Sequence, residues 1–378
     1  MLIKQTNTSI KTTSFLERIQ PPVSVFEPRR VDFLKRLSLR LYEKFTDIDS
    51  KSLSFFINQS LRVRSKENDL CTFSGLGLVF HLGPGNVPLN AIYSWFCGFL
   101  AGNQNIVRIS SRATNHEIEL VNFISYEIDK YGFQDYFLIG FDPNQFIEIS
   151  ETLADARILW GSDQTVERID NSQRNNCKDI KFGTRISCSI LDLDKIELYS
   201  DRQKHIIKNF LTTDLFTKNS QPCTSPSTIF LISKSENWYN IFSSLLPFED
   251  DPKLSIAEWN LTFSSEQINR IQELAIDYKP ISIIQKKQIH SFFINTKRMI
   301  PRELNLRIFG VCLCRSLQEV PNKITSNIQT ITYGGISTGE ILAESSLVDK
   351  SLRIVPIGQA HMFNTVWDGV DLLRSLSS

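Results

Sequence analysis

The stretch GLGLVFHLGPGNVPLNAIYSWFCGFLAGNQNIVRIS, residues 75–110, decides the fold class of this 378-residue chain. Two short apolar runs, 75–83 and 105–110, flank a longer segment, 87–102, that has the length and texture of a helix. A strand, a helix and a second strand in this order predict a right-handed crossover between parallel strands. The helical segment is too short to be a membrane span, which needs roughly 18 uninterrupted apolar residues.

The same alternation continues along the chain. Further strands are expected at 136–140, 156–161 and 179–183, and helices at 116–132, 144–154 and 162–170. Strands regularly separated by helices predict a doubly wound, nucleotide-binding α/β domain with a parallel sheet. Beyond about residue 190 the alternation loosens, and later strands indicate a second α/β domain. We therefore expect a helical lead-in, a nucleotide-binding domain, a second domain and a tail that packs back on the nucleotide-binding domain, over residues 1–62, 63–190, 191–351 and 352–378.

The composition excludes several classes of function. Forty-two basic and 41 acidic residues give a net charge of +1, so no global charge attracts nucleic acid or an anionic membrane. The N-terminus has no signal-peptide core, and the seven cysteines form no CxxC pair. Cys312 and Cys314 are too few for a metal site and are expected to fill a strand. These features predict a cytoplasmic protein without a disulfide framework, a membrane span, a metal or a nucleic-acid partner.

Cys223 lies in the polar loop NSQPCTSPS, between Pro222 and Pro226 and ahead of an apolar run. A cysteine in such a constrained loop can be a nucleophile, because thiolate chemistry needs access and nearby donors. The alternative, a partly buried and inert thiol, stays open on composition alone. His81 and His361 are not assigned a role, because a lone histidine is more often structural than catalytic.

The segment FHLGPGNVPLNA follows a predicted strand and opens a helix, which is where a doubly wound sheet binds its ligand. Gly83 and Gly85 would let the backbone approach a cofactor closely, although a plain strand-to-helix turn needs glycine as well. The side-chain amide of Asn86 could donate to a developing oxyanion. Its alternative role is to cap the helix that Pro88 helps to start.

Two further segments are candidates for cofactor binding. NIVRISSRATN places Arg108, Ser110 and Arg112 after the next strand, where arginine suits the 2′-phosphate of NADP. Solvated surface arginines are the alternative. In LWGSDQTVERI, Gly161 and Ser162 begin a helix whose N-terminus could contact phosphate or nicotinamide, although many α/β proteins have such a capped start.

Taken in order, five motifs of this chain resemble the aldehyde dehydrogenase superfamily, and within it the long-chain acyl-CoA reductases, the fatty-acid reductase component of bacterial bioluminescence. The motifs are GPGNVP, LWGS, KFGTRIS, SQPCTSP and RIVPIGQAHMFNTVWDGVDL, and the resemblance covers roughly residues 70 to 378. It implies an aldehyde-dehydrogenase-like α/β fold, in which a doubly wound Rossmann-type cofactor domain is joined to a second α/β catalytic domain.

The resemblance also implies roles for individual residues. Cys223 would be the acyl-accepting thiol, and Asn86 would form an oxyanion hole with the backbone N–H of Cys223. Arg108 would replace the ribose-binding lysine of the superfamily. The glycines and the serine that the resemblance places beside the cofactor are Gly161, Ser162 and, in KFGTRIS, Gly183.

Two departures from the superfamily bear on the reaction. Lys181 occupies the place of the glutamate that activates water in hydrolytic aldehyde dehydrogenases, and Arg307 that of the glutamate that holds the nicotinamide ribose. Without the water-activating carboxylate, a reductase can protect its thioester until hydride arrives. The resemblance therefore implies an acyl-CoA or acyl-thioester reductase that makes a fatty aldehyde through an S-acyl-cysteine, with NADPH rather than NAD.

Two alternatives stay open, namely an oxidative NAD(P)-dependent aldehyde dehydrogenase and a non-catalytic, acyl-carrying subunit of a synthetase complex. The partners implied by the resemblance are an acyl-CoA or acyl-protein donor, an acyl-protein synthetase and further copies of the chain in a homo-oligomer.

Overall fold

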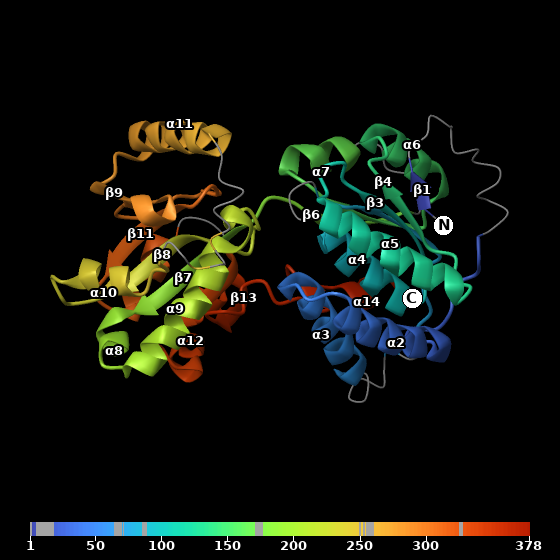
Figure 1. Ribbon diagram of the computed structural model, residues 1–378, viewed down its shortest axis with the longest axis horizontal. Coiled ribbons are helices and arrows are strands. Elements are labelled where there is room, and N and C mark those ends of the chain that lie inside the picture. Colours follow the sequence, from blue (N-terminus) through green and yellow to red (C-terminus); the bar gives the residue numbers. More distant parts are fainter. Residues whose placement is uncertain are drawn as a thin grey trace. The chain divides into compact units, whose positions relative to one another are not determined.

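The computed structural model describes residues 2–4, 19–63, 70, 72–84, 89–170, 177–248, 251, 254, 261–324 and 328–378. The chain forms two compact units. Unit 1 comprises Met1–Thr184 and Met362–Ser378, and unit 2 comprises Arg185–His361. Each unit is built around its own sheet (Figure 1).

The sheet of unit 1 has six strands in the order β1-β4-β3-β2-β5-β6, and each neighbouring pair is parallel. The strands are β1 (Leu2–Lys4), β2 (Leu78–Leu82), β3 (Gln104–Ile109), β4 (Tyr136–Ile139), β5 (Ala156–Trp160) and β6 (Lys178–Phe182). From β2 the chain passes outward through β3 to β4, and it then returns to the other side of β2 for β5 and β6. The order therefore reverses between β2 and β5, which makes this the point where a doubly wound sheet binds ligands.

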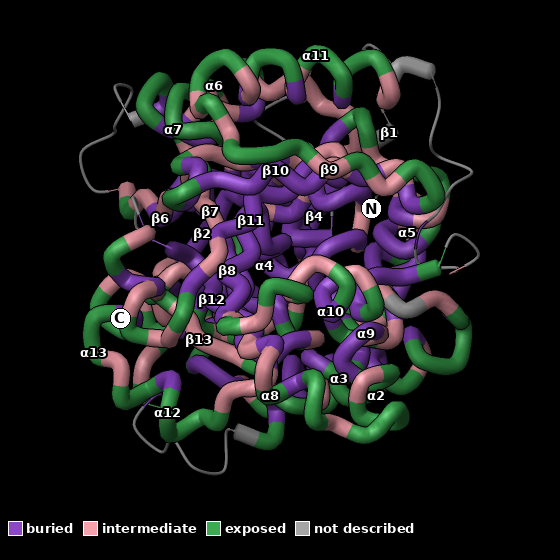
Figure 2. The backbone as a smooth tube through the Cα atoms, turned by 90° about the vertical axis from the view of Figure 1, so that its left-hand side faces the viewer, coloured by how far each residue is buried: buried purple, intermediate pink, exposed green. Residues whose placement is uncertain are grey.

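Helices cover both faces of this sheet. They are α4 (Leu89–Leu100), α5 (Asn115–Lys130), α6 (Pro143–Leu153) and α7 (Asp163–Asp170). Along β2, Phe80 packs with residues of α6 and α7, whereas Val79 packs with α4 and α5, as the alternation of side chains along a strand requires. Figure 2 shows β2 and β4 as largely buried and the outer turns of α6 as exposed.

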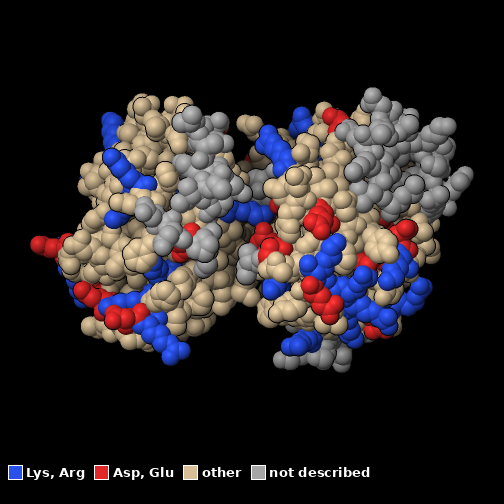
Figure 3. Space-filling model, viewed as in Figure 1, with Lys and Arg blue, Asp and Glu red and all other residues tan. Residues whose placement is uncertain are grey.

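Two helices precede β2, namely α2 (Pro28–Lys44) and α3 (Ile48–Val63), and they pack on the side of α4. Helix α2 begins where the Glu27 carboxylate accepts a hydrogen bond from the Arg30 N–H. Lys and Arg side chains gather on the visible face over α2 (Figure 3). Several are paired, including Lys35 with Asp32 and Lys44 with Glu119.

The last part of unit 1 comes from the end of the sequence. It contains β14 (Val366–Trp367), β15 (Val370–Asp371) and α14 (Leu372–Ser375). Leu372 and Leu376 are fully buried in the core that contains α4. The backbones of Ser74 and Ser378 also exchange two hydrogen bonds, of 3.0 and 2.9 Å. Residues 362–378 are thus an integral part of this unit.

The sheet of unit 2 has seven strands in the order β13-β12-β7-β8-β11-β10-β9. They are β7 (Ile186–Asp192), β8 (Pro226–Ile232), β9 (Ser282–Lys286), β10 (Ser291–Asn295), β11 (Ile308–Cys314), β12 (Ile328–Gly334) and β13 (Ser351–Pro356). All pairings are parallel except that of β9 with β10. Every residue of β8 is buried, and β7 and β11 are its neighbours.

The helical elements of unit 2 lie around this sheet (Figure 1). The α-helices are α8 (Leu193–Glu197), α9 (Asp201–Phe216), α10 (Trp238–Ser244), α11 (Leu261–Tyr278), α12 (Thr338–Ala343) and α13 (Ser345–Val348). The 3-10 turns are η2 (Thr217–Ser220), η5 (Lys287–Ile289), η6 (Leu317–Glu319) and η7 (Pro321–Lys323). Alternate residues of β8 enter different cores, since Ile229 packs in one cluster and Phe230 in another.

Two predictions from the sequence, the fold class and the lack of a membrane span, can be compared with this fold. The parallel sheet of unit 1 and the mostly parallel sheet of unit 2 confirm the predicted α/β class. None of the helices in the described part of the chain has the length and apolar character that a membrane crossing requires. The apolar segment singled out above forms α4, and all twelve of its residues are buried inside unit 1.

Candidate active site

Cys223 lies in a tight loop between α9 and β8, at the amino-terminal edge of the seven-stranded sheet. After α9 ends, Lys218, Asn219 and Ser220 all have left-handed backbone conformations, with φ of 48°, 55° and 63°. Three consecutive non-glycine residues in this region are unusual and must be held by their surroundings. The loop then closes with a hydrogen bond from the Ser225 N–H to the Pro222 carbonyl, and Cys223 is half-buried within it.

A small pocket, partly open to solvent, lies beside this loop. Three segments line it, namely the start of β7, the Cys223 loop and the coil that leads into β11. The titratable side chains in its wall, apart from Cys223 itself, are Arg185 and Glu303. Sequence reasoning assigned neither residue a role: Arg185 lies within KFGTRIS but was not singled out, and Glu303 lies 80 residues from the cysteine and within no motif.

The backbone at Cys223 is anchored from β7. The Ser187 hydroxyl donates to the Cys223 carbonyl at 2.7 Å, and the Ser227 hydroxyl donates to the Ser187 carbonyl at 3.3 Å. Both serines are buried. These bonds link the beginnings of β7 and β8 to the loop, so the position of the cysteine backbone is tied to the register of the sheet.

The next residue, Thr224, is held by His361. The Thr224 hydroxyl lies 2.8 Å from Nδ1 of His361, and Nε2 of His361 lies 3.2 Å from the Asp214 carbonyl. A carbonyl can only accept, so Nε2 carries the proton and Nδ1 accepts from Thr224. Burial lowers the pKa of His361 to about 4, so the ring is neutral near pH 7. His361 therefore orients the loop without charging it.

The described candidates for cofactor binding lie together at the carboxyl-terminal edge of the other sheet. Gly83 follows β2, Ser110 follows β3, Gly161 follows β5 and Gly183 follows β6. A Cβ atom on Gly83 would lie 2.7 Å from both the Ala91 Cβ and the Arg108 carbonyl, so only glycine fits there. The alternation of strands and helices thus places these residues at one edge of the sheet.

The two arginines of this edge differ. Arg108 lies within β3, is partly buried, and donates from Nε to the Phe141 carbonyl at 2.8 Å. Arg112 is exposed, and its backbone N–H donates to the Ser110 hydroxyl at 3.2 Å. Burial lowers the pKa of Arg108, mainly by desolvation, but arginine stays charged in proteins.

Ser162 is exposed and starts α7, since its hydroxyl accepts from the Thr165 N–H at 3.3 Å. The start of α7 is also held by the segment that follows β6, because the Thr184 N–H donates to the Asp163 carboxylate at 2.9 Å. Ser162 therefore has the capping role that was the ordinary alternative for this segment. Its contact with a cofactor remains a prediction. Lys181 is half-buried in β6.

Two other predicted residues need separate mention. Asn86 and Gly85 lie outside the residues that the structure describes. Arg307, which by the resemblance stands where the superfamily has its ribose-binding glutamate, is fully buried. Its guanidinium donates hydrogen bonds to protein oxygens, so the side chain is not accessible to a ribose.

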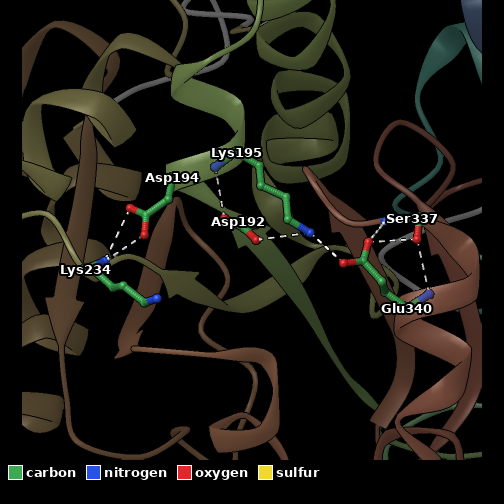
Figure 4. A network of polar contacts seen from close by, with 6 residues as sticks. All are labelled: Asp192, Asp194, Lys195, Lys234, Ser337 and Glu340. Carbon is green, nitrogen blue, oxygen red and sulfur yellow. Dashed lines mark hydrogen bonds and ion pairs between the residues drawn. The ribbon is translucent and has the colours of Figure 1, made fainter.

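The carboxyl-terminal edge of the unit 2 sheet carries a network of ion pairs and hydrogen bonds (Figure 4). Lys195 lies 2.6 Å from Glu340 and 3.7 Å from Asp192, and Asp194 accepts from the Lys234 N–H at 3.0 Å. The Lys195 ammonium holds the pKa of the Glu340 carboxyl near 2. The candidate pocket of this unit lies at the opposite edge. Within the described ranges, no group of three His, Cys, Asp or Glu residues could hold a metal ion.

Comparison with known proteins gives one family match and many structural ones. A family model described as acyl-CoA reductase (LuxC) matches residues 58–378. The long-chain acyl-protein thioester reductase 2 of Photobacterium leiognathi is 23% identical over 211 residues, which cover 51% of this chain and 43% of that protein. The chain thus spans less than half the length of that relative.

Two solved structures illustrate the likeness of fold. An indole-3-acetaldehyde dehydrogenase in complex with NAD+ superposes with a TM-score of 0.67 and 10% identity, covering 94% of this chain and 84% of that one. The glyceraldehyde-3-phosphate dehydrogenase GapN of Methanocaldococcus jannaschii, in complex with NADP, gives a TM-score of 0.65 and 13% identity, covering 93% and 88%. These likenesses confirm the predicted aldehyde-dehydrogenase-like fold.

Proposed function

Because the chain belongs to the acyl-CoA reductase (LuxC) family, as its motifs predicted, we propose that it reduces an acyl thioester to an aldehyde. The observation that carries this proposal is the pocket around Cys223, where a half-buried thiol lies in a loop held by strained backbone and by neighbouring side chains. A loop held in a strained conformation beside a pocket suits a nucleophilic cysteine better than a cysteine that only packs in the core.

Cys223 would attack the carbonyl carbon of the acyl donor, and the donor thiolate would leave, so that an S-acyl-cysteine forms. The Cys223 N–H and the Asn86 amide would donate to the oxyanion that develops during this attack. Removing one such donor typically slows the reaction by about 100- to 1000-fold. We therefore expect a loss of this size in Asn86→Ala without loss of the fold, and full activity would refute the assignment.

The carboxyl-terminal edge of the unit 1 sheet supports a nicotinamide cofactor, because the strand order reverses there between β2 and β5, where doubly wound sheets bind ligands. Gly83, Gly85, Gly161, Ser162 and Gly183 would contact it. When bound, it would supply the hydride that reduces the S-acyl-cysteine to a thiohemiacetal, which then releases the aldehyde and restores the Cys223 thiolate.

We propose NADPH rather than NADH, with Arg108, Ser110 and Arg112 beside the 2′-phosphate. Arg108 keeps its Nη atoms for such a contact while Nε is bound to the Phe141 carbonyl. Arg108→Ala should raise KM for NADPH by roughly tenfold and leave KM for NADH unchanged, and Arg112→Ala tests the second arginine in the same way. Equal effects on both cofactors would refute a role in 2′-phosphate binding.

The donor would be a fatty acyl-CoA or an acyl group delivered by an acyl-protein synthetase. Lys181 supports reduction over oxidation, since by the resemblance it replaces the carboxylate that would activate water against the thioester. We propose that the chain acts as a homo-oligomer.

The deciding experiment supplies acyl-CoA and NADPH to the wild type, to Cys223→Ala and to Cys177→Ala, which changes the other half-buried cysteine of the described chain. We expect NADPH oxidation and aldehyde release from the wild type and Cys177→Ala only. A carboxylic acid formed from aldehyde and NADP+ would favour the oxidative alternative. Acyl label retained on the wild type without NADPH consumption would favour the acyl-carrier alternative.

A further inference from the structure

Arg307 is a charged side chain with no exposed surface, and it sits at the same edge of the sheet as Cys223. It directly precedes β11, and the Cys223 loop precedes β8, its parallel neighbour. Leu306 and Arg307 both have left-handed backbone conformations, with φ of 55° and 56°. Burying a guanidinium is costly unless its donors are satisfied, so its contacts must be specific.

Those contacts converge on Asn219. Nε and Nη2 of Arg307 lie 3.0 and 2.8 Å from the Asn219 Oδ1, so two donors of the guanidinium share one oxygen. Nη1 donates to the Ile289 carbonyl at 3.3 Å, and Nη2 also donates to the Leu254 carbonyl. The planar guanidinium stays protonated at any working pH, so this set of donors is permanent.

Asn219 is the middle residue of the three left-handed residues before the cysteine, and only 5% of its surface is exposed. Its neighbour Ser220 donates from its hydroxyl to the Leu215 carbonyl at 2.6 Å. Ser220, Gln221 and Cys223 line the same pocket. The backbone path of residues 218–220 therefore decides where the thiol is placed.

We propose that Arg307 is a positioning residue for Cys223. The two hydrogen bonds from its guanidinium to Asn219 hold residues 218–220 in the left-handed backbone conformation. This conformation places the Cys223 thiol at the pocket. The catalytic part of this inference rests on the proposed function of Cys223, whereas the ordering of the loop does not. Arg307 thus acts on the nucleophile rather than at the cofactor-ribose position that the family resemblance indicates.

Variants at both ends of the contact test this. Asn219→Gly keeps a residue that adopts positive φ freely but removes the acceptor, and Asn219→Asp keeps the acceptor and tolerates the same conformation. Arg307→Lys keeps the charge and loses the pair of hydrogen bonds to Asn219. Arg157→Lys is the matched control, because Arg157 is equally buried but lies in unit 1, paired with Asp179 at 2.7 Å.

The readouts are amide hydrogen exchange of residues 217–225 and steady-state kinetics per folded molecule, all in the full chain. Arg307→Lys and Asn219→Gly should speed exchange in this loop about tenfold or more. They should also lower kcat roughly 10- to 100-fold at unchanged KM. The double variant should lose no more than either single one, because both remove the same contact. Asn219→Asp should stay within about twofold of the wild type, and Arg157→Lys should leave loop exchange unchanged.

Unchanged loop exchange in Arg307→Lys would overturn the proposal, and so would losses that multiply in the double variant. A wild type without acyl-reducing activity would refute the proposed function alone. The exchange data would still decide whether Arg307 orders the loop.

Discussion

The hydroxyl of Thr224 lies 2.8 Å from Nδ1 of His361, across 137 residues of sequence, so a histidine near the end of unit 2 holds the residue next to Cys223. In Thr224→Val this donor is replaced by a methyl group, and Nδ1 loses its partner. We expect the free energy of unfolding to fall by about 1–3 kcal/mol, measured by urea denaturation. Thr224→Ser keeps the hydroxyl and should lose much less. A smaller loss in Thr224→Val than in Thr224→Ser would mean that the methyl group, not the hydrogen bond, stabilises the loop.

Acid should destabilise the protein through His81. Its Nε2 donates to the Asn105 Oδ1 at 2.9 Å, and its Nδ1 accepts from the Ser94 hydroxyl at 2.8 Å. Burial lowers its pKa from 6.5 to about 4, so the unfolded chain binds the proton more tightly than the folded one. The full stability is present above pH 6.5 and is lost as the pH falls toward 4, by up to about 3 kcal/mol.

Urea unfolding between pH 7.5 and 4 measures this loss. His81→Gln should flatten the dependence, whereas a change at the exposed His205 should leave it as in the wild type. An unaltered slope in His81→Gln would show that other groups cause the acid sensitivity.

A methyl group at Gly83 should damage unit 1. Because its Cβ would lie 2.7 Å from both the Ala91 Cβ and the Arg108 carbonyl, strand β2 and helix α4 must move apart. We expect Gly83→Ala to cost about 1–3 kcal/mol in urea denaturation. Gly339→Ala is the control, since nothing lies within 4 Å of a Cβ there and alanine favours its helix α12. A harmless Gly83→Ala would contradict the tight packing at this turn.

Alkylation should distinguish the cysteines. Burial raises the pKa values of Cys97, Cys188, Cys312 and Cys314, the last from 9.0 to about 11, which lowers its thiolate fraction about 100-fold. Brief treatment of the native protein with iodoacetamide, followed by peptide mass spectrometry, should therefore label the half-buried Cys223 and spare those four. Labelling of Cys188 ahead of Cys223 would contradict the burial described here.

Several elements could be predicted from local pattern alone. The apolar run 75–83 contains β2, and the segment 87–102 contains α4. Both could be predicted because a buried strand needs a short apolar run and a buried helix a longer one. The candidates for cofactor contact share one edge for the same reason, since parallel strands end on the same side. Their roles in binding, like that of Cys223 in catalysis, stay predictions.

Other features depend on contacts that no local pattern encodes. His361 was given no role from sequence, and its bond to Thr224 exists only once the tail of unit 2 is folded. Arg307 was noted as a departure from the superfamily that the motifs resemble, but its partner Asn219 is 88 residues away. A left-handed asparagine and a buried arginine look like ordinary surface residues in a sequence. The local signals thus describe strands and helices better than the loops between them.

The assignment of residues 362–378 to unit 1 has a consequence for biosynthesis. These residues emerge from the ribosome only after the whole of unit 2, yet they supply buried side chains such as Leu372 and Leu376 to the core around α4. Unit 2 is continuous in sequence, so its core needs no residues from a later part of the chain. Unit 1 keeps an incomplete core until residues 362–378 have been synthesised. It is therefore the unit that we expect nascent-chain chaperones to protect.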